Sequence, residues 1–241
     1  MTSERHQKGH VAKFIKGVYM TNNDRIDELD NTSIAKSRAG IYRLLSMMYL
    51  KEVSEEFLKT LKSEEIIDAF NELGVDFSKI LFDKSEDKLL DELATEYAAL
   101  FIVPGGIPPY ESVRLKGMLC QEPEWQVRDF YKRCGLTVKE DTKIFSDHLG
   151  MELEFMAYLA DKEADAWKSN GEKTAGQWSS MQKEFFASHL DKWVFSFLKD
   201  MDKCAFHPFY KEVSKLTRSF LDVEKEDFGV KQILDMKQGI C

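Results

Sequence analysis

Apolar residues recur every three or four positions along most of the chain, which is the spacing of one face of an α-helix. The pattern predicts a helix from Asn31 to about Leu50, with Thr32 or Ser33 as its cap. Further helices are predicted at residues 54–62, 63–73, 85–101, 122–134, 147–168, 178–200 and from 208 onward. No stretch alternates apolar and polar residues with β-branched enrichment, so no strand is predicted. The expected fold class is all-α, a single compact multi-helix bundle.

The two ends of the chain differ in pattern. Residues 1–30 are polar with little periodicity, whereas residues 31–241 carry the helical pattern. We therefore expect an N-terminal extension followed by one all-helical domain. No apolar run is long enough to cross a bilayer, and the first residues lack the apolar core of a secretory signal. We expect a cytoplasmic protein with no direct membrane insertion.

Composition narrows the classes of partner. The 241 residues are 43% hydrophobic and 32% charged, which is typical of a soluble globular protein. A formal net charge of -8 argues against a nucleic-acid partner and suits a cationic one. The four cysteines form no CxxC pair, so spacing indicates neither a zinc site nor a redox dithiol.

The stretch "IVPGGIPPYESVRL", residues 102–115, concentrates three of the 5 prolines. Prolines fix φ and remove N–H donors, so this stretch is expected to be a stiff loop that presents the residues after it. The expected loop-shaping residues are Pro104, Gly105, Pro108 and Pro109, and the presented residues are Tyr110, Glu111 and Ser112. A phosphate loop is not indicated, because the lysine and hydroxyl of GxxxxGK[ST] are missing. A plain connector remains the alternative.

A second candidate stretch is "SDHLGMELEF", residues 146–155, at the start of a predicted helix. Asp147 or Ser146 is expected to cap this helix, and His148 and Glu152 lie four apart on one face. A histidine and a carboxylate could begin a metal site or act in general base catalysis, but two ligands do not make a metal site. No nucleophile motif accompanies them, so a capped helix start with a histidine near the surface is favoured.

Several aromatic residues are expected to fill the core, although any that faces a groove could anchor a peptide. They are Trp125, Trp178, Phe185, Phe186 and Trp193.

Three stretches together resemble one family, the TorD/DmsD/NarJ-type cytoplasmic chaperones that assemble molybdenum oxidoreductases. "EYAALFIVPGGIPPYESVRL" resembles that family's Y-x-x-L-F followed by a proline loop, and "DHLGMELEFMAYL" its Asp-His helix start. "FFASHLDKWVFSF" is similar to its F-x-x-x-H-L-x-x-W-x-x-x-F helix. Order and spacing agree across roughly residues 35–220. One departure is "KIFSDH", where the family often has Glu and Pro before the Asp-His pair.

The resemblance implies an all-helical chaperone of the TorD-like type that is not an enzyme and has no catalytic residues, cofactor or metal. It implies binding of the N-terminal, commonly twin-arginine, signal peptide of an apo-molybdoenzyme catalytic subunit until the molybdopterin cofactor is inserted. Proteins of molybdopterin biosynthesis are a further implied partner. A receptor for two guanidiniums and an apolar run needs carboxylates beside an apolar groove. The expected peptide-binding residues are Tyr110, Glu111, Ser112, Asp147, His148 and Glu152.

Two other functions stay open at this point. One is a metal-dependent or nucleotide hydrolase that uses the Asp147–His148 segment. The other is a permanent structural subunit of a membrane oxidoreductase. The sequence leaves both a monomer and a homodimer possible.

Overall fold

The fold is an assembly of helices, seen in a computed structural model that describes residues 30–72, 74–138, 143–169 and 171–230. The α-helices are α2 (Asn31–Leu50), α3 (Glu55–Leu61), α4 (Glu64–Glu72), α5 (Ser78–Phe82), α6 (Glu86–Tyr97), α7 (Glu111–Lys116), α8 (Glu122–Arg133), α9 (Leu149–Lys168), α10 (Glu172–Phe185), α11 (Asp191–Cys204) and α12 (Pro208–Asp227). Two π-helical turns, η2 (Ala98–Ile102) and η3 (Phe186–Leu190), extend α6 and join α10 to α11. The prediction of an all-α bundle is confirmed, with no strand in the described ranges.

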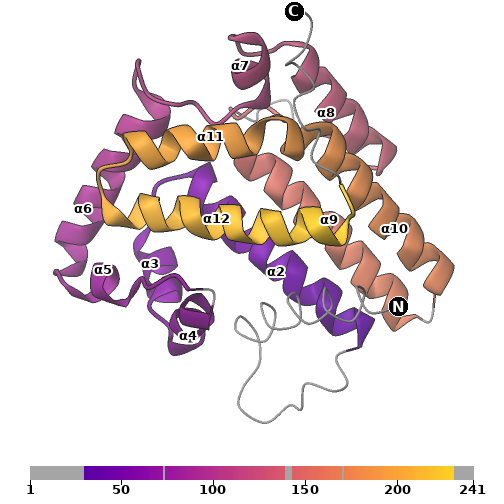
Figure 1. Ribbon diagram of the computed structural model, residues 1–241, viewed down its shortest axis with the longest axis horizontal. Helices are drawn as coiled ribbons and strands as arrows, with labels where there is room; N and C mark the ends of the chain where they lie inside the picture. The colour runs from indigo at the N-terminus through magenta and orange to yellow at the C-terminus, as the bar shows by residue number, and fades with distance from the viewer. Residues whose placement is uncertain (1–29, 73, 139–142, 170, 231–241) are drawn as a thin grey trace, which may run out of the picture.

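Two pairs of long helices form the centre of the bundle. Figure 1 shows α11 and α12 side by side and antiparallel, with α2 and α9 running obliquely behind them. The short helices α3, α4 and α5 lie at one end with α6, and α7, α8 and α10 lie at the other. Buried apolar side chains from α2 through α12 form one continuous hydrophobic core. Of the predicted polar extension, only Asp30 is among the described residues.

Helix α2 shows how the apolar pattern produces the core. Ile41, Tyr42, Leu45 and Met48 fall on one face at helical spacing and are buried against α9. The cap differs from the prediction: Asp30, not Thr32 or Ser33, accepts a hydrogen bond from the Ser33 N–H at 2.7 Å. A cap needs extended backbone one residue before the helix, and here that residue is Asp30.

The helix predicted at residues 178–200 begins earlier than expected. The stretch at 168–177 looked like a polar connection, yet α10 starts at Glu172 and the helical path continues through η3 and α11 to Cys204. The first turns of α10 are mostly exposed, so they show little apolar periodicity. Only Ala175 in this stretch is fully buried.

The loop between η2 and α7 is shaped by its glycines and prolines, in line with its composition. Gly105 has a φ of 93°, which is unfavourable for other residues. A Cβ on Gly106 would lie 2.5 Å from the Leu100 carbonyl oxygen, so no larger residue fits there. The Ile107 N–H also donates to that carbonyl oxygen. The loop therefore folds back over η2 before Pro108 and Pro109 lead into α7.

Candidate functional site

The two sequence stretches singled out by their motifs meet in space. The Leu149 N–H donates to the Pro109 carbonyl at 2.8 Å, and the Glu111 N–H donates to the Asp147 carbonyl at 2.9 Å. Tyr110 and His148 form an isolated antiparallel β-bridge between these bonds. The end of the proline loop is thus fixed to the start of α9.

The residue that caps α9 differs from the prediction, which named Asp147 or Ser146. Asp147 Oδ2 accepts a hydrogen bond from the Ser112 N–H at 2.7 Å, so Asp147 caps α7 rather than its own helix. His148 caps α9, because its Nδ1 accepts from the Gly150 N–H at 3.1 Å. A short helix at 111–116 was not predicted, and its presence explains why Asp147 points toward it.

The expected peptide-binding residues come together, but mostly in the interior. Glu111, Asp147 and Glu152 are at most 1% exposed, Ser112 is fully buried and His148 is 4% exposed. Tyr110 is half-buried, with its ring edge-on to the His148 ring at a centroid distance of 4.8 Å. The sequence-based expectation of carboxylates along an open groove and of a histidine near the surface is therefore wrong for this conformation. Each carboxylate contacts another element: Asp147 contacts α7, Glu111 contacts η3 and Glu152 contacts α11.

A fourth buried acid, Glu124 of α8, joins them, and we call Glu111, Glu124, Asp147 and Glu152 the acid cluster. Glu111 Oε2 lies 2.9 Å from His189 Nδ1, and Glu152 Oε2 accepts from Trp193 Nε1 at 3.2 Å. His189 and Trp193 are the histidine and tryptophan of the third motif, so all three motifs converge here. Glu124 was missed because an acid in the first turn of a helix normally faces solvent and favours the helix dipole.

The acid cluster leaves several buried oxygen atoms without a hydrogen-bond partner among the described residues. They are Ser112 Oγ, Glu124 Oε2, Ser146 Oγ, Asp147 Oδ1 and Glu152 Oε1. The nearest permanent cation is Arg128, which donates to Glu124 Oε1 from a half-exposed position. Buried carboxylates are normally paired or fully hydrogen-bonded, so this site carries an excess of acceptors.

Burial and crowding change the proton affinities in the site. Burial, with the negative charges of Glu111 and Asp147, raises the pKa of Glu152 well above its ordinary value. Burial also raises the pKa of Asp147, against the hydrogen bonds from Ser112. For His148, burial lowers the pKa to about 4, which keeps the ring neutral as an acceptor. Burial therefore favours the neutral forms of Glu152, Asp147 and His148.

The helices α7 and α8, which contribute Glu111 and Glu124 to the acid cluster, and the turn between them also carry exposed apolar side chains. Leu115 at the end of α7, Met118 and Leu119 in the following turn, and Trp125 of α8 are 41%, 62%, 42% and 55% exposed. We call these four residues the α7–α8 surface. Of the aromatic residues expected in the core, Phe185, Phe186 and Trp193 are buried and Trp178 packs partly buried, whereas Trp125 faces out. Grouped exposed apolar side chains commonly mark a binding surface.

The described part of the chain contains neither a candidate metal site nor a candidate membrane-spanning helix. No three His, Cys, Asp or Glu side chains there are arranged to hold a metal ion. Within the same ranges, none of the helices combines the length and the apolar character that a membrane span requires.

Comparison with known proteins gives relatives of one kind. Residues 55–199 match the family model described as nitrate reductase delta subunit. The chain is 28% identical over 216 residues to the chaperone protein TorD of Shewanella sp. strain MR-4, which covers 82% of this chain and 97% of the relative. It is 27% identical to the chaperone protein TorD of Vibrio cholerae serotype O1 strain M66-2, which covers 79% and 91%.

A solved structure shares the fold. A protein from Archaeoglobus fulgidus assigned to redox enzyme maturation superposes with a TM-score of 0.51 at 20% identity and covers 77% of this chain and 93% of its own.

Fold, converging motifs and relatives define the class: this is a helical assembly chaperone, not an enzyme. Because the family model spans more than half of the chain, the chain belongs to the nitrate reductase delta subunit family, the TorD/NarJ-type chaperones.

Proposed function

We propose that this chaperone serves the apo-form of a molybdoenzyme catalytic subunit in the cytoplasm and binds its N-terminal signal peptide until the molybdopterin cofactor is inserted. The observation that carries the proposal is the α7–α8 surface, which lies directly after the proline-loop motif. These four side chains are already about half buried, so covering each one against the apolar run of a peptide supplies about 1 kcal/mol, roughly half the value for full burial. Trp125 is the natural anchor, since tryptophan is enriched among binding hot spots.

The acid cluster supplies the second half of the recognition. It lies beneath α7 and holds more carboxylate oxygens than hydrogen-bond donors. A guanidinium brings five donors and a positive charge, which matches this excess. Since the carboxylates are covered, recognition requires α7 to shift. Gly117, in the left-handed conformation at the end of α7, and Gly105 before it bound the segment that would move.

The α7–α8 surface can be tested by calorimetry with a synthetic twin-arginine signal peptide of a molybdoenzyme catalytic subunit. We expect Trp125→Ala to weaken binding about 10- to 100-fold, the range of a hot-spot residue. Phe82→Ser is the matched control, because Phe82 is also exposed, at 58%, but belongs to α5. Equal weakening by both variants, or by Phe82→Ser alone, would place the peptide elsewhere.

The charge recognition has its own test. Asp147→Asn keeps an oxygen for the Ser112 N–H but removes the negative charge. We expect it to weaken binding of a twin-arginine peptide about tenfold, and to leave a peptide with both arginines replaced by glutamine unaffected. If wild-type protein binds both peptides equally, the acid cluster does not recognise the arginines.

A further inference from the structure

A second groove lies at the opposite end of the bundle from the α7–α8 surface. Two depressions adjoin at His207 and Pro208, where α12 begins beside α5 and α6. One, of about 600 Å³, is also bordered by Lys79, Ile80, Phe82, Asp83, Lys84 and Leu89. The other, of about 460 Å³, is bordered by acidic residues of α6 and by Phe206. Because Leu89 and the acids share α6, the depressions follow one another along that helix, and we call them together the α6 groove.

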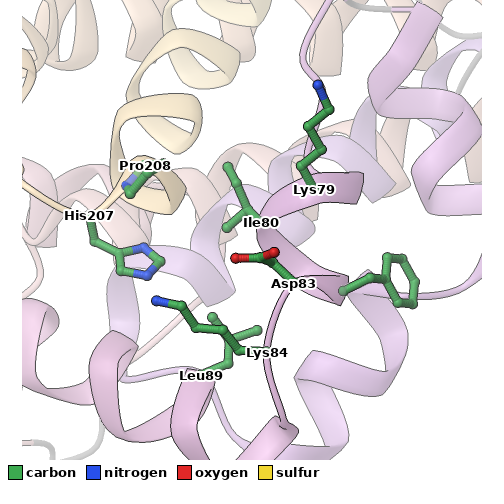
Figure 2. Close-up of a pocket in the computed structure, with 8 residues that line it drawn as sticks. Lys79, Ile80, Asp83, Lys84, Leu89, His207 and Pro208 are labelled. Carbon is green, nitrogen blue, oxygen red and sulfur yellow. The ribbon is translucent and has the colours of Figure 1, made fainter.

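Figure 2 shows the first depression. The Asp83 and Lys84 side chains extend across it toward His207, whereas Lys79 points away. Lys84 Nζ donates to Glu92 Oε2 at 2.6 Å, so its charge is used within the protein. Asp83 has no ion-pair partner among the described residues. Leu89 is fully buried beneath this depression, so the accessible apolar contacts come from Ile80 and Phe82. The accessible charges are the free carboxylate of Asp83 and the Lys79 ammonium, which points away.

The second depression is acidic. Asp91, Glu92 and Glu96 all border it, and no cationic side chain does apart from His207. Glu92 Oε2 lies 3.4 Å from His207 Nε2, and Glu96 Oε1 accepts the N–H groups of Phe206 and His207. Asp91 is exposed and has no ion-pair partner in the part of the chain that the structure describes. Asp91 is therefore the carboxylate best placed to meet an incoming cation.

The aromatic ring beside these acids is held outward. Phe206 is 85% exposed, although its backbone N–H is fixed at 2.6 Å from Glu96 Oε1. The following His207 caps α12 and Pro208 opens it, so the backbone on that side is rigid as well. An exposed phenylalanine on a rigid backbone loses little freedom when it is covered, which favours binding.

We propose that the α6 groove is a second docking site, for an extended basic and apolar segment of the client protein that is separate from its signal peptide. The occupant is chosen by charge complementarity. Its arginine or lysine side chains meet Asp91 and Asp83, which have no ion-pair partner among the described residues. Its aromatic or leucine side chains cover Phe206 and Phe82, which are 85% and 58% exposed. That the occupant belongs to a client protein rests on the proposed function. Binding of a basic and apolar segment in the α6 groove, however, does not require the signal-peptide site.

The probe for this site is the peptide GRLFRG-amide with fluorescein attached through its N-terminal amine, and its binding is followed by fluorescence anisotropy. The charge-reversed GELFEG-amide, labelled in the same way, is the control peptide. We expect the wild-type protein to bind the basic probe and Asp91→Asn/Phe206→Ser to bind it at least tenfold more weakly, with affinity falling as salt rises. The matched control is Asp129→Asn/Ile102→Ser, which removes one exposed acid and one exposed apolar side chain outside both proposed sites. It should bind the probe as wild type does.

Four results would overturn the proposal: no binding of the basic probe, equal binding of the charge-reversed peptide, equal loss in both double variants, or full displacement of the probe by unlabelled signal peptide. Because both changed side chains are exposed, Asp91→Asn/Phe206→Ser should keep the wild-type melting temperature. The two proposals also fail separately. Loss of signal-peptide binding with retained probe binding refutes only the signal-peptide site, and the reverse refutes only the α6 groove.

Discussion

Two buried polar clusters in this protein resemble each other in composition and differ in how their atoms are paired. In the first, which we call the arginine cluster, Arg38 of α2 is 7% exposed and donates to Glu224 and Glu163. Tyr42 also donates to Glu224, and Gln182 and Trp167 to Glu163, so all four carboxylate oxygens accept hydrogen bonds. In the acid cluster, three carboxylate oxygens have no partner among the described residues.

The contrast separates structure from function. The arginine cluster joins α2, α9, α10 and α12. Burial opposes the charge of Arg38, but Glu224 and Glu163 raise its pKa, so the cation is charged and every oxygen of the two carboxylates is hydrogen-bonded. Gln182 Oε1 is left without a partner among the described residues, but it carries no charge. The acid cluster gathers four carboxyl groups around one half-exposed arginine, and protons take the place of missing cations. A satisfied cluster has nothing to offer a ligand, whereas an unsatisfied one favours any cation that reaches it.

The largest expected effect comes from breaking the satisfied cluster. Arg38→Met keeps much of the side-chain volume but leaves Glu163 and Glu224 buried without their cation. We expect a loss of about 3–5 kcal/mol in the free energy of unfolding, measured by urea denaturation. Arg43→Met is the matched control, since Arg43 pairs with Asp161 and Glu154 at the surface and should contribute about 0–1 kcal/mol. Similar losses in both variants would contradict the distinction drawn here.

The next effect is a pH dependence beside the acid cluster. Burial lowers the pKa of His148 to about 4 in the folded protein, against 6.5 for an ordinary histidine. The unfolded chain therefore takes up this proton first, and stability is lost as pH falls from about 6.5 to 4. The shift corresponds to about 3 kcal/mol over that window. His148→Asn, which can still cap α9, should lose less stability than wild type between pH 7 and 4.5. Parallel curves for the two proteins would show that His148 is not responsible.

The smallest expected effect has the opposite sign. Glu152→Gln keeps an oxygen for Trp193 Nε1 and removes a buried charge. Because the pKa of Glu152 is raised in the folded protein, its ionisation destabilises the fold as pH rises above the unfolded value of about 4.5. We expect the variant to equal wild type near pH 4.5 and to be about 1–2 kcal/mol more stable at pH 8. A variant less stable than wild type at pH 8 would mean that the acid cluster is already satisfied.

Much of the fold could be predicted from apolar spacing and end signals. The pattern located α2, α8 and α12, with Pro123 in the first turn of α8 and Pro208 at the start of α12. Gly135, at a φ of 78°, follows the end of α8 as expected. The short helices α5 and α7 were missed, because five or six residues carry too few apolar positions to show a period.

The candidate site was predictable in its residues and not in its burial. The motifs named Tyr110, Glu111, Asp147, His148 and Glu152, and the structure brings them together. Their exposure depends on how α7 and α8 cover them, which is a tertiary property that no local pattern contains. Charged residues are usually exposed, and a prediction made from that tendency is wrong for this cluster, whose acidic side chains are buried.

The π turn at η3 has a consequence for anyone who aligns or grafts this segment. A π turn takes one more residue than an α turn, so the helical wheel drawn for residues 172–185 is out of phase, by roughly 100°, with that for 191–204. His189 lies within this phase slip, opposite Glu111. If an alignment places a single-residue gap here, the gap therefore means that α11 is rotated about its axis relative to α10. It does not mean that a loop residue has been lost.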